Sequence, residues 1–92
     1  MSDTSVLRAT VEVRLPEGLH LRPLTQLSRI AQSFTATIFL LRGDQRADAK
    51  RPLDLMALGA GCGEQLVVET AGVDADTALE TVVRLFESNF AE

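Results

Sequence analysis

Residues 7–23 read LRATVEVRLPEGLHLRP, and this stretch contains the change from strand to helix from which the fold can be worked out. Apolar and polar residues alternate at every position over residues 7–15, which is typical of a β-strand with one buried face. The proline, glutamate and glycine at 16–18 indicate a turn that ends the strand. Over residues 23–31 apolar side chains recur at helical spacing. The stretch therefore predicts a half-buried strand, a loop and an amphipathic helix.

The rest of the chain contains further strand-like and helix-like segments. In order, these are a β-branched strand over residues 35–41, a turn at Arg42-Gly43-Asp44, a weaker strand over residues 45–49, a short helix over residues 53–58 ended by Gly59, a glycine-rich loop over residues 59–63 and a strand over residues 65–70. A glycine-rich loop that opens a helix can bind a dinucleotide, but this loop precedes a strand and lacks that context.

A final amphipathic helix follows Ala71-Gly72, which breaks the last strand. Asp74 is the expected N-cap of this helix, and Thr77 with Glu80 forms an alternative capping box. The apolar residues expected on its buried stripe are Leu79, Val82, Val83, Phe86 and Phe90.

The order of these elements is β-α-β-β-(short α)-β-α, which suits an α+β domain with helices on one face of a sheet. Alternation in the first strand indicates that the other face of the sheet is exposed to water. The pattern leaves the order of the strands in the sheet open. Because a chain of 92 residues has room for one core, we expect residues 1–92 to form a single domain.

The composition, 46% hydrophobic and 24% charged, is that of an ordinary folded protein. A net charge of -4 argues against nucleic acid as the main partner. With no recognisable signal peptide and no apolar stretch of membrane-spanning length, we expect a cytoplasmic protein without membrane insertion. The single Cys62 cannot form an internal disulfide and has no basic neighbour to activate it. With one histidine and one cysteine, neither a metal nor a cofactor is expected.

The one histidine of the chain, His20, lies in Gly18-Leu19-His20-Leu21-Arg22-Pro23, at the predicted boundary between strand and helix. Near neutral pH a histidine ring is largely neutral and can act as a nucleophile. The start of a helix favours an anion, and an arginine adds charge-assisted hydrogen bonds to a phosphate. Since a residue before proline resists the α conformation, Arg22 is expected either just outside the helix or inside it under mild strain. Pro23 itself suits the first turn of a helix.

Position alone does not decide the role of His20, because a lone histidine is more often a residue without a function. The motif Gly18-Leu19-His20-x-Arg22-Pro23 resembles the active-site signature of the histidine-containing phosphocarrier protein (HPr) family of the bacterial phosphoenolpyruvate:sugar phosphotransferase system. The resemblance covers about residues 6–90. It includes the order of the elements, the Ala49-Lys50 pair before the short helix and the Leu58-Gly59 pair that ends it.

The resemblance implies an open-faced β-sandwich, in which three helices cover one side of a four-stranded antiparallel sheet. It implies that His20 accepts phosphate on Nδ1 from phosphorylated enzyme I and passes it to an enzyme IIA domain, while Arg22 stabilises the phosphate. The residues implied in partner docking or at the helix N-terminus of the site are Gly18, Leu21, Pro23, Leu53 and Met56. From the residues alone, Leu53 and Met56 could equally cover the core.

Two positions depart from the family pattern. Many Gram-positive members begin the short helix with a serine that a kinase phosphorylates, and the corresponding residue here is Arg51. Regulation by a serine kinase at this helix is therefore expected to be absent. Arg51 is either a contact for an acidic partner, an offset to Asp48 and Asp54, or a tolerated surface charge. Glu17 stands where an uncharged polar residue is common, and its carboxylate can weaken the affinity for phosphate, although an exposed glutamate usually has little effect.

These observations predict a phosphocarrier that works with enzyme I and enzyme IIA-type proteins in transient complexes, and that is itself a monomer. A second interpretation is an HPr-like regulatory binding protein, in which phosphorylation of His20 is a switch and takes no part in sugar transport. A generic α+β ligand-binding domain with an incidental motif is a third, and the weakest. The identity of the phosphate acceptor distinguishes the first two.

Overall fold

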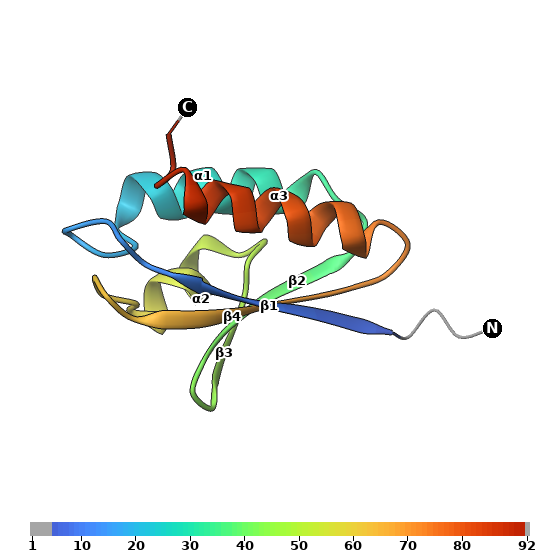
Figure 1. Cartoon of the computed structure of the whole chain (residues 1–92), viewed down its shortest axis with the longest axis horizontal. Coiled ribbons are helices and arrows are strands. Elements are labelled where there is room, and N and C mark those ends of the chain that lie inside the picture. The colour runs from blue at the N-terminus through green and yellow to red at the C-terminus, as the bar shows by residue number, and fades with distance from the viewer. Residues whose placement is uncertain (1–4, 92) are drawn as a thin grey trace.

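The computed structural model describes residues 5–91 and contains a four-stranded antiparallel sheet with the strand order β1-β4-β2-β3. The elements are β1 (Val6–Glu12), α1 (Leu21–Gln32), β2 (Thr37–Arg42), β3 (Gln45–Asp48), α2 (Pro52–Leu58), β4 (Gln65–Ala71) and α3 (Ala75–Glu87). The long helices α1 and α3 run side by side over one face of the sheet, and α2 lies against β3 and α1 (Figure 1). This is the open-faced β-sandwich that the resemblance implied.

The core between the helices and the sheet is mostly aliphatic, with Phe86 and Phe90 as its aromatic members. Every second residue of the strands faces the apolar stripes of the helices. The largest fully buried side chains include Leu24, Leu27, Ile38, Leu40, Leu55 and Leu66. Complete burial of such a side chain contributes about 1.5–3 kcal/mol relative to its exposure to water. These buried side chains hold the helices against the sheet.

The strand β1 is shorter than the sequence predicted. Its last paired residue is Glu12, which lies opposite Gln65 at the start of β4. Beyond that pair the neighbouring chain is a loop, and the N–H of Val13 donates to the carbonyl of Glu64 (2.9 Å). Val13 and Leu15 are nevertheless buried. The predicted burial pattern is confirmed, whereas the predicted strand end was wrong because the chain opposite residues 13–15 is not a strand.

The start of α3 confirms Asp74 as the N-cap, whereas the alternative capping box is absent. Asp74 is the N-cap, but its carboxylate does not bond to its own helix and accepts hydrogen bonds from the N–H groups of Thr35 (3.0 Å) and Ala36 (2.7 Å). Because α3 begins at Ala75, Thr77 lies inside the helix and cannot open a capping box. Asp74 thus joins the start of α3 to the segment before β2. The two N–H groups that it occupies take no part in the sheet, and β2 begins two residues later than predicted.

The end of α3 also differs, because the helix ends at Glu87 and Phe90 is not part of it. Asn89 and Phe90 have left-handed backbones, with φ of 58° and 61°. This reversal returns the Phe90 ring to the core, where it meets Phe86 edge to face at 4.9 Å between centroids. Burial of Phe90 is confirmed, and its predicted place on the helix was wrong. Leu85 is buried as well and was absent from the predicted stripe.

Candidate functional site

His20 lies at the N-cap of α1, with φ −83° and ψ −171°, and the helix begins at the next residue. Leu21 and Arg22 are therefore the first two residues of α1, and Pro23 is the third. Of the two positions considered for Arg22, the structure shows the one inside the helix. The N–H that Pro23 lacks belongs to the first turn, where it would have no intrahelical acceptor. The anion-binding end of α1 thus follows the histidine directly.

The turn before His20 is held by the loop that follows α2. Gly18 has a φ of +73°, and a Cβ added there would lie 2.8 Å from the carbonyl oxygen of Ala60 and 3.0 Å from Cα of Gly61. The N–H of Leu19 donates to the same carbonyl of Ala60 (3.0 Å), and its side chain is buried. Glycine is required at position 18 by both conformation and space. This packing fixes the backbone from which the His20 ring projects.

The His20 ring is partly accessible, with 37% of its side chain exposed, which is enough for a partner to reach it. Its Nε2 lies 3.7 Å from Oε1 of Glu17, whose own side chain is 78% exposed. The contact is a weak one in solvent. It places negative charge on the Nε2 side of the ring, away from Nδ1.

Three apolar side chains near the histidine face solvent. Leu21 is 67%, Leu53 74% and Met56 56% exposed, whereas Leu55 and Leu58 of the same short helix face the core. Met56 lines an open hollow together with His20 and Leu21. Leu53 lies three residues before Met56 and so on the same side of α2. For Leu53 and Met56 the alternative of covering the core was wrong, and both remain predicted docking residues.

A second open hollow adjoins His20 along α1. Its lining residues are His20, Leu21, Arg22, Thr25, Gln26 and Arg29. Arg29 is exposed seven residues after Arg22, so both guanidinium groups lie along one face of the helix. Arg29 was not among the residues predicted for the site. The spacing of the two arginines was the signal that could have identified it.

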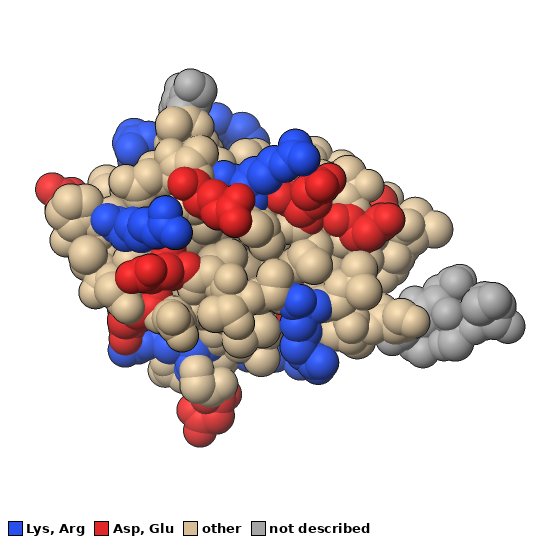
Figure 2. Space-filling model, in the orientation of Figure 1, with Lys and Arg blue, Asp and Glu red and all other residues tan. Residues whose placement is uncertain are grey.

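Charged side chains of both signs are interspersed on the face of the molecule shown in Figure 2. This face carries no continuous basic surface of the kind that binds a nucleic-acid backbone. Within residues 5–91, no group of three or more histidine, cysteine, aspartate or glutamate side chains could hold a metal ion. Over the same residues, no helix has the length and apolar character needed to cross a membrane.

The sequence family described as "PTS HPr component phosphorylation site" matches residues 7–88 of this chain. The chain belongs to the HPr family. It is similar to the phosphocarrier protein HPr of Treponema pallidum (strain Nichols), with 37% identity over 83 residues that cover 90% of this chain and 94% of the relative. It is also similar to the phosphocarrier protein NPr of Escherichia coli (strain K12), with 36% identity over 88 residues that cover 94% of this chain and 97% of the relative.

Solved structures of the HPr family agree with the fold. HPr-C-His from Thermoanaerobacter tengcongensis superimposes with a TM-score of 0.89 at 29% identity, covering 94% of this chain and 97% of that one. The helices and strands that position His20 therefore have the arrangement found in this family.

At the start of α2 this HPr-family chain has Arg51 as the N-cap, with φ −117° and ψ 106°. Its Nε lies 3.8 Å from the Oδ1 of Asp54, in the first turn of the helix. The carboxylate offsets the unfavourable interaction of an arginine with the positive end of the helix dipole. No serine or threonine occurs between Asp44 and Gly63, so α2 offers no hydroxyl to a kinase.

Proposed function

We propose that this protein is a phosphocarrier of the phosphotransferase system and that residues 1–92 form a single cytoplasmic domain that works as a monomer. Phosphorylated enzyme I donates a phosphoryl group to His20, and an enzyme IIA-type domain accepts it. The observation that carries the proposal is the position of the partly exposed His20 ring at the N-cap of α1, with Arg22 in the first turn. Membership of the HPr family supports the same reaction.

The proposed chemistry depends on the two ring nitrogens of His20. In a neutral ring, one nitrogen carries a proton and the other a lone pair. The Glu17 carboxylate, 3.7 Å from Nε2, favours the tautomer with the proton on Nε2 and the lone pair on Nδ1. Attack by Nδ1 forms the N–P bond while the bond from phosphorus to the donor breaks, and its electron pair stays with the donor. The phosphorylated ring is then cationic with its proton on Nε2, beside Glu17.

The phosphoryl group needs positive partners but no enclosed pocket, because each protein partner supplies the rest of the transfer site. The start of α1 offers the N–H groups of its first turn and the positive end of the helix dipole. The guanidinium of Arg22 lines the hollow beside His20 and can add charge-assisted hydrogen bonds. Leu21, Leu53 and Met56 give an exposed apolar surface beside the ring, which suits a transient complex.

A regulatory binding protein that uses phosphorylation of His20 as a switch is the second candidate function. This second function has support because the chain is about equally similar to proteins named HPr and NPr, with 37% and 36% identity. The absence of a hydroxyl on α2 does not distinguish the two functions. It excludes regulation by a serine kinase at that helix in both cases and leaves His20 unchanged. The fate of the phosphoryl group separates the two.

Incubation with radiolabelled phosphoenolpyruvate and purified enzyme I tests the proposed function. We expect an acid-labile, base-stable label on the wild-type protein and none on His20→Ala, since the chain contains no other histidine. A wild-type protein without label, or an undiminished label on His20→Ala, would overturn the proposal. A chase with an enzyme IIA domain then distinguishes a carrier, which loses its label to the acceptor, from a regulator, which keeps it.

A further inference from the structure

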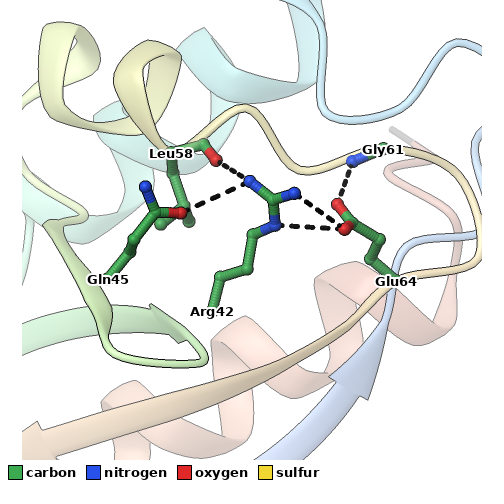
Figure 3. A network of polar contacts seen from close by, with 5 residues as sticks. All are labelled: Arg42, Gln45, Leu58, Gly61 and Glu64. Carbon is green, nitrogen blue, oxygen red and sulfur yellow. Dashed lines mark hydrogen bonds and ion pairs between the residues drawn. The ribbon is translucent and has the colours of Figure 1, made fainter.

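A network of polar contacts surrounds Arg42 at the end of β2 and Glu64 just before β4 (Figure 3). Nε and Nη2 of Arg42 both lie 3.0 Å from Oε2 of Glu64. Nη1 of Arg42 donates to the carbonyl of Leu58 (2.8 Å) and to Oε1 of Gln45 (3.3 Å). The second carboxylate oxygen of Glu64 accepts the N–H of Gly61 (2.6 Å). We call the pair Arg42 and Glu64, with these contacts, the clamp.

The clamp holds both ends of the loop that follows α2. Leu58 is the last residue of α2, and a carbonyl at that position receives no hydrogen bond from an N–H of its own helix. Arg42 supplies its donor, while Gly59 ends the helix with a left-handed backbone, φ +65°. Glu64 holds the N–H of Gly61 and through Arg42 is tied to β2. The loop is therefore fixed by side chains from outside α2 and not only by its own turns.

This loop, residues 59–64, is the one on which the His20 turn rests. The carbonyl of Ala60 accepts the N–H of Leu19, the residue before the histidine (3.0 Å). Ala60 and Gly61 are also the backbone atoms that approach Gly18 so closely that no side chain fits there. A shift of the loop would therefore move the backbone that carries His20.

The same clamp is bonded to the helix that carries the predicted docking residues. Leu53 and Met56 lie on α2, whose final carbonyl Arg42 holds. One guanidinium thus connects the docking helix to the loop beneath His20. The ion pair of Arg84 with Glu80 lacks this connection, because both residues lie on α3, 3.3 Å apart.

The geometry points to Arg42 and Glu64 as positioning residues for phosphotransfer. They keep residues 59–64 in the one arrangement that holds His20 at a fixed place relative to the docking surface of α2. This inference rests on the proposed function and adds to it residues that touch neither the ring nor the phosphate. Reacting groups misplaced by about 1 Å can lose on the order of 100-fold in rate, so a support of this kind affects transfer without contacting it.

The test compares Arg42→Met, Glu64→Gln and the double variant with the wild type. Methionine keeps the length of the arginine stem and removes its donors, whereas glutamine keeps an acceptor for Gly61 and removes the charge. Arg84→Met is the matched control, because it removes a guanidinium from an exposed ion pair elsewhere. Two quantities are measured on protein shown by urea denaturation to be folded under the assay conditions: the hydrogen exchange of the Leu19 amide, and kcat/KM for phosphoryl transfer from enzyme I.

We expect Arg42→Met to speed exchange of the Leu19 amide and to lower kcat/KM about tenfold, with Glu64→Gln in the same direction and weaker. The double variant should lose little more than Arg42→Met, since both residues act through one network. Exchange and transfer equal to those of Arg84→Met would overturn the inference, as would slower transfer with unchanged Leu19 exchange. If the wild type itself accepts no phosphate, the proposed function fails, and Leu19 exchange alone still decides whether the clamp positions the turn.

Discussion

Gly18 fixes the backbone position of His20, although it takes no part in the chemistry. Its left-handed backbone brings the turn against the carbonyl of Ala60 at a distance that excludes any Cβ. Gly43 has a similar φ, +60°, but nothing lies within 4 Å of the position that its Cβ would take. The two glycines thus separate the effect of conformation from the effect of crowding.

Gly18→Ala should destabilise the fold more than Gly43→Ala. Both variants strain the backbone by about 1–2 kcal/mol, and only Gly18→Ala adds an overpacking term of about 1–3 kcal/mol. Urea denaturation of the two variants measures the difference in the free energy of unfolding. Equal losses of stability would show that the loop at Ala60 gives way freely and does not fix the turn.

Arg22→Ala should slow phosphotransfer and leave the fold stable. A hydrogen bond to a charged group is worth about 1.5–3 kcal/mol, so its loss in the transition state corresponds to a decrease of tenfold or more in kcat/KM. Arg22 is exposed, so the free energy of unfolding should change little. Transfer rates that match the wild type would remove Arg22 from the site.

For single residues, the sequence correctly predicted that His20 and Arg22 lie together at the start of a helix, because the spacing of a motif is local. The contact of Glu17 with Nε2 and the hollow shared with Arg29 were not predicted. Both depend on the directions of side chains across a turn or along a helix, which the order of residues does not define.

Among the elements, α3 is joined to β2 by the Asp74 carboxylate. The N–H of Thr35 holds the pKa of this carboxyl below its ordinary value of 3.8; burial opposes the effect, and the N–H of Ala36 adds to it. Since the pKa is lower in the folded state than in the unfolded state, the ionised carboxylate stabilises the fold above about pH 3.8. This stabilisation is lost as the pH falls through the folded pKa.

Asp74→Asn removes this titration. We expect the free energy of unfolding of the wild type to fall more steeply than that of Asp74→Asn as the pH decreases below about 3.8. Urea denaturation at a series of acidic pH values provides the comparison. Parallel curves for the two proteins would contradict the assignment of the carboxylate to Thr35 and Ala36.

The elements themselves were predicted within two residues at most boundaries, because hydrophobic periodicity is a local signal. The errors have a common physical cause. The end of β1 depends on where β4 supplies a partner, Asp74 bonds to a segment about 39 positions away in sequence, and Phe90 returns to the core through a left-handed turn. Each is a tertiary contact that no periodicity contains.

For the molecule as a whole, the start of α1, where His20 is the N-cap, lies at one end of the helical layer, whereas the loop between β4 and α3 lies at the other (Figure 1). The strand order β1-β4-β2-β3 pairs the first strand of the chain with the last. The residues alone left this order open, because pairing between β1 and β4 spans most of the chain. The family resemblance supplied the architecture.

Met56→Ser should weaken binding to enzyme I and leave the fold intact. Met56 is 56% exposed, so its replacement removes apolar docking area without opening the core. Val73→Ser is the control, since Val73 is 85% exposed in the β4–α3 loop. A rise in KM of several-fold for Met56→Ser alone, measured in the transfer assay with enzyme I, is the expected result. An equal KM for both variants would place the docking surface elsewhere.

In the proposed reaction, Nδ1 of His20 carries the phosphoryl group. Phosphorus NMR of the protein after incubation with phosphoenolpyruvate and enzyme I tests it most directly. We predict one phosphohistidine signal, assigned to Nδ1 and absent from His20→Ala, because the Glu17 carboxylate beside Nε2 favours the tautomer with the lone pair on Nδ1. A phosphoryl group on Nε2, or a spectrum without phosphohistidine, would contradict it.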